Sequence, residues 1–174
     1  WQITFASPAT TGAHKADLSD INEQTIELNS SSFDDFVSKL QPEIVLFDRF
    51  MMEEQFGWRV EKHCPTALRL LDTEDLHSLR QARHQALKQN RAVEKRDLNS
   101  ELAIREVASI LRCDLTLMVS SYEVALLTNH FKVDPSLLHC LPFMLPPCQP
   151  KDSSWPSFEQ RQHFISIGNF RHAP

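Results

Sequence analysis

The sequence predicts an α/β fold, a Rossmann-like doubly wound parallel sheet with helices on both faces. Short apolar runs alternate with helical patterns through most of the chain, and the connections between them are short. One run, Glu43–Phe47, is apolar without alternation, which favours burial on both faces of a parallel sheet. This run and Ala67–Leu71 both lead directly into acidic residues. Such sheets bind their ligands beyond the carboxyl ends of the strands.

The first expected elements are two strands and a helix. Gln2–Ala6 is predicted as a strand, and because it has no lead-in we expect a piece of the domain to be missing before Trp1. Alternating residues at Gln24–Leu28 suit a half-buried strand. A helix is expected between the N-cap at Ser31 or Ser32 and Pro42. Its apolar face is formed by residues at helical spacing, namely Phe33, Phe36, Val37 and Leu40.

The remaining elements of the domain alternate regularly. In order, we expect the strand Glu43–Phe47, a helix over Arg49–His63, the strand Ala67–Leu71, a helix from Leu76 to about Gln89, a helix from about Leu98 to Leu111, the strand Leu115–Val119, a helix reaching about Phe131 and a strand at Leu137–Leu141. Asp75 is the predicted N-cap of the helix that begins at Leu76. Ser120 and Glu123 have the spacing of a capping box for the last helix.

A proline-rich stretch divides the chain. Five prolines lie between residues 142 and 156, with charged and small polar residues among them, which is a linker composition. We therefore expect a domain over residues 1–145, a linker over residues 146–160, and the start of a second, truncated domain at residues 161–174. His163–Gly168 is the expected first strand of that second domain.

Composition excludes several classes of function. The 174 residues suit one domain, or one domain with a fragment of another, and the net charge of −5 argues against a general nucleic-acid binder. The three glycines, Gly12, Gly57 and Gly168, stand too far apart for a glycine-rich phosphate loop. The four cysteines form no CxxC pair and no zinc spacing, so we expect free thiols in a reducing cytoplasm and no metal site.

Four segments in their order resemble bacterial glycosyltransferases of the group 1, or family 4, type: Phe47–Trp58, Leu71–Arg80, Val119–Glu123 and Ile167–Pro174. The resemblance covers most of the chain. It implies the GT-B architecture, in which two Rossmann-like domains face a cleft. It also implies that residues 1–145 form the N-terminal, acceptor-side domain and that the C-terminal, donor-side domain begins near residue 160.

The resemblance implies an activity and its substrates. The full-length enzyme would transfer a sugar from a nucleotide-sugar, UDP- or GDP-linked, to a hydroxyl of a carbohydrate or lipid-linked acceptor, with no tightly bound cofactor. The donor is held chiefly by the C-terminal domain in that family. Most of that domain and the first βα unit are expected to be missing here, so the fragment alone is expected to be inactive.

The turn from Asp72 to Arg80 is the first candidate site. Asp72 and His77 are the candidate catalytic residues, which would orient or deprotonate an acceptor hydroxyl. Glu74, Asp75 and Arg80 are candidate substrate-binding residues, and the arginine could meet a phosphate or pair with a carboxylate. The alternative is an ordinary capped helix start with a solvated histidine.

Further candidates lie at other strand ends. Asp48 and Arg49 follow the neighbouring strand and are candidate substrate-binding residues, with a structural ion pair as the alternative. Ser120 and Glu123 could bind substrate or serve only as a helix cap. The resemblance assigns the donor diphosphate to the segment containing three residues, namely Gly168, Asn169 and Arg171.

Partners and location follow from the same patterns. A basic stretch between residues 80 and 96 could approach an anionic membrane or a lipid-phosphate acceptor, although a solvated helix and loop is the favoured interpretation. We therefore expect a cytoplasmic protein without membrane spans that could contact the inner membrane surface peripherally. The fragment could also form a homodimer across its open sheet. The alternative functions are a non-catalytic α/β ligand-binding or interaction module and, with less support, a receiver-like signalling domain.

Overall fold

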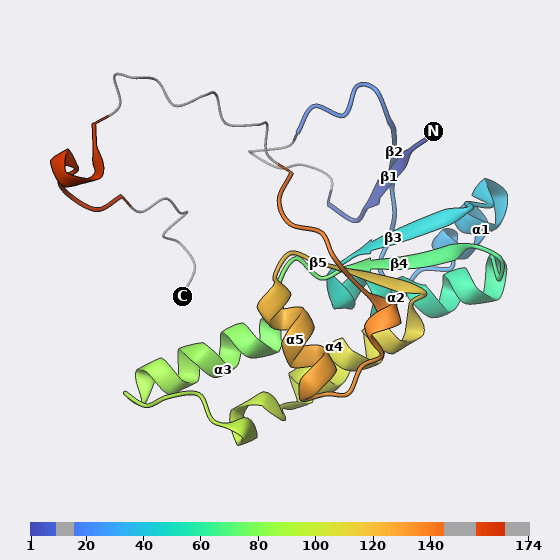
Figure 1. The fold of residues 1–174 in the computed structure, drawn as a ribbon. Coiled ribbons are helices and arrows are strands. Elements are labelled where there is room, and N and C mark those ends of the chain that lie inside the picture. The colour runs from blue at the N-terminus through green and yellow to red at the C-terminus, as the bar shows by residue number, and fades with distance from the viewer. Residues whose placement is uncertain (10–15, 145–155, 166–174) are drawn as a thin grey trace.

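The computed structural model describes residues 1–9, 16–144 and 156–165 (Figure 1). The strands are β1 Thr4–Ser7, β2 Asn22–Thr25, β3 Ile44–Asp48, β4 Leu68–Asp72, β5 Leu115–Met118 and β6 Leu138–Cys140. The α-helices are α1 Ser32–Leu40, α2 Arg49–His63, α3 His77–Lys88, α4 Glu101–Arg112 and α5 Ser121–Asn129. Short 3₁₀ turns lie at Lys95–Leu98, Pro135–Leu137 and Phe158–Gln160. None of these described helices is long and apolar enough to cross a membrane.

The described strands form two separate parallel sheets. Strands β3, β4, β5 and β6 lie side by side in chain order, while β1 pairs only with β2. The register places Asp48 opposite Asp72, and Asp72 opposite Leu117, so the carboxyl ends of β3, β4 and β5 meet at one edge. The α/β class, with helices alternating with parallel strands in a Rossmann-like pattern, is confirmed.

The described helices cover one face of the four-stranded sheet. Figure 1 shows α2, α4 and α5 below it, and the strand residues directed to that side, Phe47, Leu71 and Met118, are at most 4% exposed. On the opposite face Ile44 and Leu46 are 42% and 53% exposed. The expected burial of Glu43–Phe47 on both faces is therefore wrong, and helices on both faces are not found within the described residues. The strand looked continuously apolar because its second face is apolar but uncovered.

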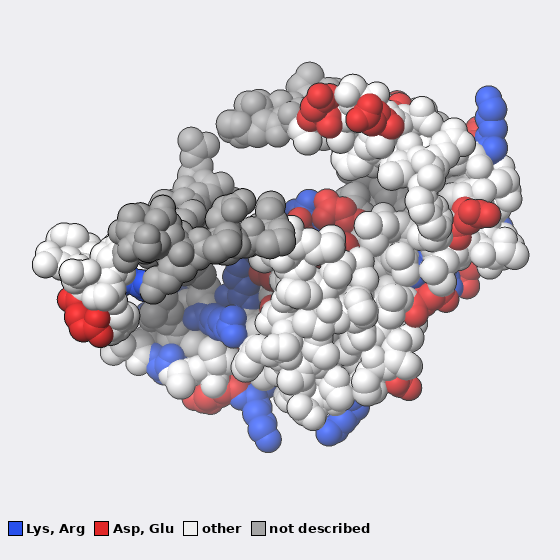
Figure 2. Space-filling view, turned by 45° about the horizontal axis from the view of Figure 1, so that its top comes forward, with Lys and Arg blue, Asp and Glu red and all other residues white. Residues whose placement is uncertain are grey.

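Uncharged side chains dominate the surface seen from above the sheet. Figure 2 turns the top of the first view toward the reader, and the centre of the visible body is uncharged, with charged side chains mainly around its margin. Parallel sheets normally have both faces covered, because their strands carry few polar side chains. The uncovered face is thus an unusual feature of this molecule.

Several predicted boundaries are corrected. The second strand was predicted at Gln24–Leu28 but is Asn22–Thr25, and its four residues are exposed. The buried residue Ile26, which was expected inside this strand, follows it instead. Helix α4 begins at Glu101, where Ser100 accepts a 3.2 Å hydrogen bond from the N–H of Ala103, so Leu98 falls in the preceding turn. By contrast, the predicted bounds of α2 are confirmed.

The second-domain predictions receive no support from the described residues. His163–Ile165 lie outside any strand, so the predicted strand His163–Gly168 is wrong for these three residues. Residues 166–168 and most of the proposed linker lie outside the described residues. The division into domains therefore stays a prediction.

Gly57 leaves room for a buried carboxylate on α2. A Cβ atom built at Gly57 would overlap Oε1 of Glu53, which lies one turn earlier and is 2% exposed. Glu53 cannot move away easily, since both of its oxygens accept hydrogen bonds from Arg112. The glycine that weakens the helical pattern is thus explained by packing.

Gly57→Ala is expected to lower the free energy of unfolding by about 1 kcal/mol, because the new methyl group displaces Glu53. Helix propensity alone predicts the opposite, a gain of about 1 kcal/mol. Urea denaturation followed by circular dichroism measures the difference. In a Glu53→Ala background the same substitution should become stabilising, and a stabilising effect in the wild-type background would contradict the prediction.

Candidate functional site

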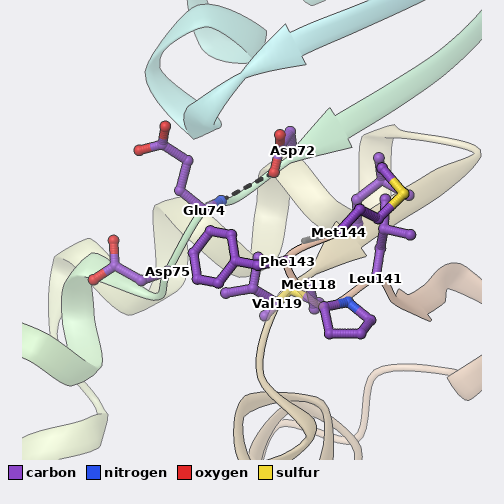
Figure 3. A pocket seen from close by; sticks show the side chains of 10 residues that line it. Asp72, Glu74, Asp75, Met118, Val119, Leu141, Phe143 and Met144 are labelled. Atoms are coloured by element: carbon purple, nitrogen blue, oxygen red, sulfur yellow. Dashed lines mark hydrogen bonds between the residues drawn. The ribbon is translucent and has the colours of Figure 1, made fainter. Parts of the chain in front are cut away.

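A pocket of about 580 Å³ lies at the carboxyl ends of β4, β5 and β6. One side carries three carboxylates, from Asp72, Glu74 and Asp75 (Figure 3). The rest of the lining is apolar and comes from the ends of the two following strands, namely Leu117, Met118, Val119, Leu141, Pro142, Phe143 and Met144. The pocket therefore combines acceptor-only polar groups with an apolar wall, which is the usual character of a small-molecule site.

Asp72 and Glu74 are positioned by the turn between β4 and α3. The Oδ1 atom of Asp72 accepts a 3.2 Å hydrogen bond from the N–H of Glu74. Glu74 has a φ of 56°, a left-handed conformation that is uncommon for a residue other than glycine. Thr73 fixes the turn from below, because its hydroxyl donates a 3.1 Å hydrogen bond to the carbonyl of Leu117. The turn thereby holds two carboxylates at the pocket rim.

Arg49 repeats this geometry at the end of the neighbouring strand. It also has a left-handed φ, of 68°, and its guanidinium donates to both oxygens of Asp48 at 3.1 and 2.9 Å. The hydrogen bond to Asp48 raises the pKa of Arg49. Nε of Arg49 lies 3.9 Å from Oε2 of Glu74. Asp48 and Arg49 thus form the ion pair that was the alternative prediction, and the pair reaches across to the rim without lining the pocket.

Asp75 faces the pocket and lies close to a guanidinium group and an imidazole ring. Its Oδ2 lies 3.1 Å from Nη1 of Arg80, and its Oδ1 lies 3.7 Å from Nε2 of His77. The structure therefore brings Asp75, His77 and Arg80 together as predicted, although neither His77 nor Arg80 lines the pocket. The His77 ring packs edge-on against Phe50, with 5.6 Å between ring centroids.

The predicted N-cap at Asp75 is wrong. The N-cap residue of α3 is Leu76, and no side chain from the turn accepts a capping hydrogen bond from the helix. Two carboxylates from other helices do so instead. Glu106 of α4 accepts hydrogen bonds from the N–H groups of His77, at 2.7 Å, and Ser78, at 3.0 Å. Oε1 of Glu123 accepts from the N–H of Leu76 at 3.1 Å.

Glu123 is also not the acid of a capping box. Ser120 accepts a 3.4 Å hydrogen bond from the N–H of Glu123, so the serine half of the motif is present. The Glu123 side chain turns away toward α3, where it is 6% exposed and its Oε2 has no hydrogen-bond partner. Burial raises the pKa of Glu123, against the effect of the hydrogen bond from Leu76, which lowers it. Neither Ser120 nor Glu123 lines the pocket.

The sequence patterns missed two components of the site. Glu106 was not singled out, although it falls on the buried stripe of α4 at helical spacing from Ala103 and Ile110, a signal that the sequence does contain. The apolar wall at Leu141–Met144 was not predicted, because it follows a strand end without any charged residue. The candidate residues Gly168, Asn169 and Arg171 lie outside the described residues.

The chain matches no protein-family model, no curated protein and no solved structure. The fold shows the α/β class and its parallel sheet, and no match assigns the chain to a family.

Proposed function

We propose that the chain is the acceptor-side part of a glycosyltransferase, and that the pocket beside β4 binds a sugar hydroxyl group. The observation that supports this most is the set of three carboxylates, Asp72, Glu74 and Asp75, along one side of a half-apolar pocket. Carboxylates accept hydrogen bonds from neighbouring hydroxyls, and the C–H face of a sugar suits an apolar wall such as that at Phe143. The site lies beyond the carboxyl ends of parallel strands, where such sheets bind ligands.

In the transfer reaction we assign the orienting role to Asp72, with Asp75 beside it. An acceptor hydroxyl that donates to the Asp72 carboxylate would have its oxygen lone pairs directed away from the rim, toward an incoming sugar. His77 acts through Asp75, from 3.7 Å, as a positioning residue. A nucleotide-sugar would supply the glycosyl group, and stabilisation of the departing diphosphate would provide most of the rate acceleration.

A non-catalytic ligand-binding module is the second candidate. It is favoured by the position of His77, whose ring packs on Phe50 instead of lining the pocket. Asp75 is similarly engaged by Arg80. In this function the same pocket binds a sugar and no transfer follows.

Calorimetric titration of a full-length version with UDP-sugars and GDP-sugars, and of the 174-residue chain with free hexoses, tests both candidates. We expect Asp72→Asn to weaken hexose binding by about tenfold, the effect of losing one charge-assisted hydrogen bond. Asp35→Asn, an exposed aspartate of α1, is the matched control and should bind as the wild type does.

The outcomes separate the two functions. Hexose binding that Asp72→Asn weakens, together with nucleotide-sugar binding to the full-length version, supports the transferase. Hexose binding without any nucleotide binding supports the ligand-binding module. If neither class binds, or if Asp72→Asn changes nothing, the proposal of a sugar site is wrong.

A further inference from the structure

A groove that is larger than the sugar pocket lies beside β3, at the opposite end of the four-stranded sheet from β6. Its volume is about 640 Å³, and it separates β1 from β3. Residues 1–8 form one wall, β3 forms the other, and apolar residues of α1 and α2 form the floor, among them Phe33, Phe36, Val37 and Phe56. No lysine or arginine lines the described groove, and its carboxylates, Asp48 and Asp72, stand at the carboxyl ends of β3 and β4.

Among the described strands, none pairs with the outer edge of β3, which forms this wall of the groove. Strand β3 is the terminal strand of its sheet, and the N–H of Leu68 donates to the carbonyl of Glu43 at 2.8 Å. Backbone groups of a strand point alternately to its two sides. Those of Glu43, Val45 and Phe47 therefore point to β4, and those of Ile44 and Leu46 point into the groove.

The opposite wall repeats this arrangement. The carbonyl group of Ile3 accepts a hydrogen bond from the N–H of Asn22 in β2 at 3.0 Å, and that of Ser7 accepts one from Ile26, just past β2, at 3.1 Å. By the same alternation the backbone groups of Thr4 and Ala6 point away from β2, on the side of β1 that lines the groove. Strand β2 contributes no residue to the lining. As far as the described residues go, both walls thus present main-chain donors and acceptors that pair with no strand.

Large apolar side chains line the groove and remain exposed. Ile3 is 54% exposed, Phe5 48%, Ile44 42% and Leu46 53%. Leu40, on the predicted buried face of α1, is 41% exposed for the same reason, since that face opens into the groove. Exposed apolar strand edges favour pairing with another strand, and native proteins normally block them with charges, prolines or a covering segment.

We propose that this groove binds one extended, apolar peptide strand, which hydrogen-bonds to the free edge of β3. Only an extended main chain supplies donors and acceptors at the spacing that the Ile44 and Leu46 backbone requires. Alternate side chains of the strand would contact the floor formed by α1 and α2, and the others would lie on the uncovered face of the sheet beside Ile44 and Leu46. A helix satisfies its own backbone groups and would leave the β3 edge unpaired.

Strand binding would also change the sheet. The four-stranded sheet would gain a fifth strand, and the backbone groups of Ile44 and Leu46 would no longer face water. The groove and the sugar pocket share Asp72, but the peptide strand would pair with the edge of β3, whereas the sugar site uses the carboxyl ends of the strands.

Selection from a random decapeptide library displayed on mRNA, against the immobilised 174-residue chain, tests the proposal. We expect the recovered peptides to alternate aliphatic or aromatic residues over at least four positions. Leu46→Glu should weaken binding of a recovered peptide by about tenfold or more, because the carboxylate would be buried in an apolar groove. Leu87→Glu is the matched control, since Leu87 is an exposed leucine of α3 outside the groove, and it should leave binding unchanged.

A chemical control distinguishes strand pairing from simple apolar contact. Methylation of the alternate peptide nitrogens that face β3 should abolish binding, since it removes the N–H donors of the pair. Phe5→Glu provides a second groove variant if Leu46→Glu fails to fold by circular dichroism. Sedimentation of the chain alone identifies a competing occupant, because a dimer that Leu46→Glu dissociates would mean that a second copy fills the groove.

The proposal is wrong in any of four cases. These are a selection that yields no peptide, peptides without the alternation, binding that neither the groove variants nor methylation of the peptide nitrogens weakens, and the dimer just described.

Discussion

Glu106→Ala is expected to lower the free energy of unfolding by about 3 kcal/mol. Glu106 is 4% exposed, and its two oxygens accept hydrogen bonds from the N–H groups of His77 and Ser78. Alanine leaves both donors unpaired at a buried helix start, and a hydrogen bond to a charged group contributes roughly 1.5–3 kcal/mol. Urea denaturation of the variant and the wild type measures the loss.

Two further variants of α4 make this result specific. Glu106→Gln keeps one acceptor oxygen and should lose about half as much stability. Glu101→Ala removes an exposed acid from the first turn of the same helix and should cost about 0.5 kcal/mol, through the helix dipole alone. A loss below about 1 kcal/mol for Glu106→Ala would show that water replaces the carboxylate at this site.

The hydrogen bonds that Glu106 accepts at the start of α3 also affect the pocket. Because α3 begins at His77, any shift of its first turn moves Asp75, which lines the pocket. We therefore expect Glu106→Ala to weaken ligand binding at the pocket, although Glu106 does not line it. Glu106 is a positioning residue in this sense.

Glu53→Ala is expected to lower the free energy of unfolding by about 2 kcal/mol. Glu53 is 2% exposed, and Nε of Arg112 donates to its two oxygens at 2.9 and 3.1 Å. This hydrogen bonding raises the pKa of Arg112. Breaking a fully buried ion pair costs roughly 3–5 kcal/mol, but the Arg112 side chain is 44% exposed and water can solvate it after the change.

The adjacent acid supplies the control. Glu54 pairs with Arg105 at 2.6 Å, but this pair lies on the surface, so Glu54→Ala should cost only about 0.5 kcal/mol. A double-mutant cycle of Glu53→Ala with Arg112→Ala measures the coupling directly. Equal losses for Glu53→Ala and Glu54→Ala would contradict the distinction between the buried and the exposed pair.

Local patterns predicted the elements well where one signal dominated. Helix α2 lies between a strand that ends in Asp48 and the Cys64-Pro65 stop, and its bounds were predicted correctly. The buried stripe of α1, with Phe33 and Val37, followed from helical spacing. Boundaries failed where the deciding contact lies far along the chain, as at Asp75, whose capping role passes to Glu106 and Glu123.

The candidate site was predicted in part. The strand ends at Asp48 and Asp72 could be placed at one edge, because parallel strands carry their carboxyl ends to the same side. Which of the polar residues line the pocket could not be read from the sequence. The side-chain directions depend on the left-handed turns at Arg49 and Glu74, and on an apolar wall brought from β6.

The sequence by itself determined the α/β class, the order of strands and helices, and the acidic character of the strand ends. These depend on short-range periodicity and on the rule that parallel strands share a polarity. Only the tertiary structure decided that the described helices cover one face of the sheet and that β3 is a free edge. It also decided that the Asp72–Arg80 turn is held by Glu106 and Glu123. These features arise from contacts between residues about 30 to 50 positions apart, and no local pattern specifies which distant donor a buried carboxylate will meet.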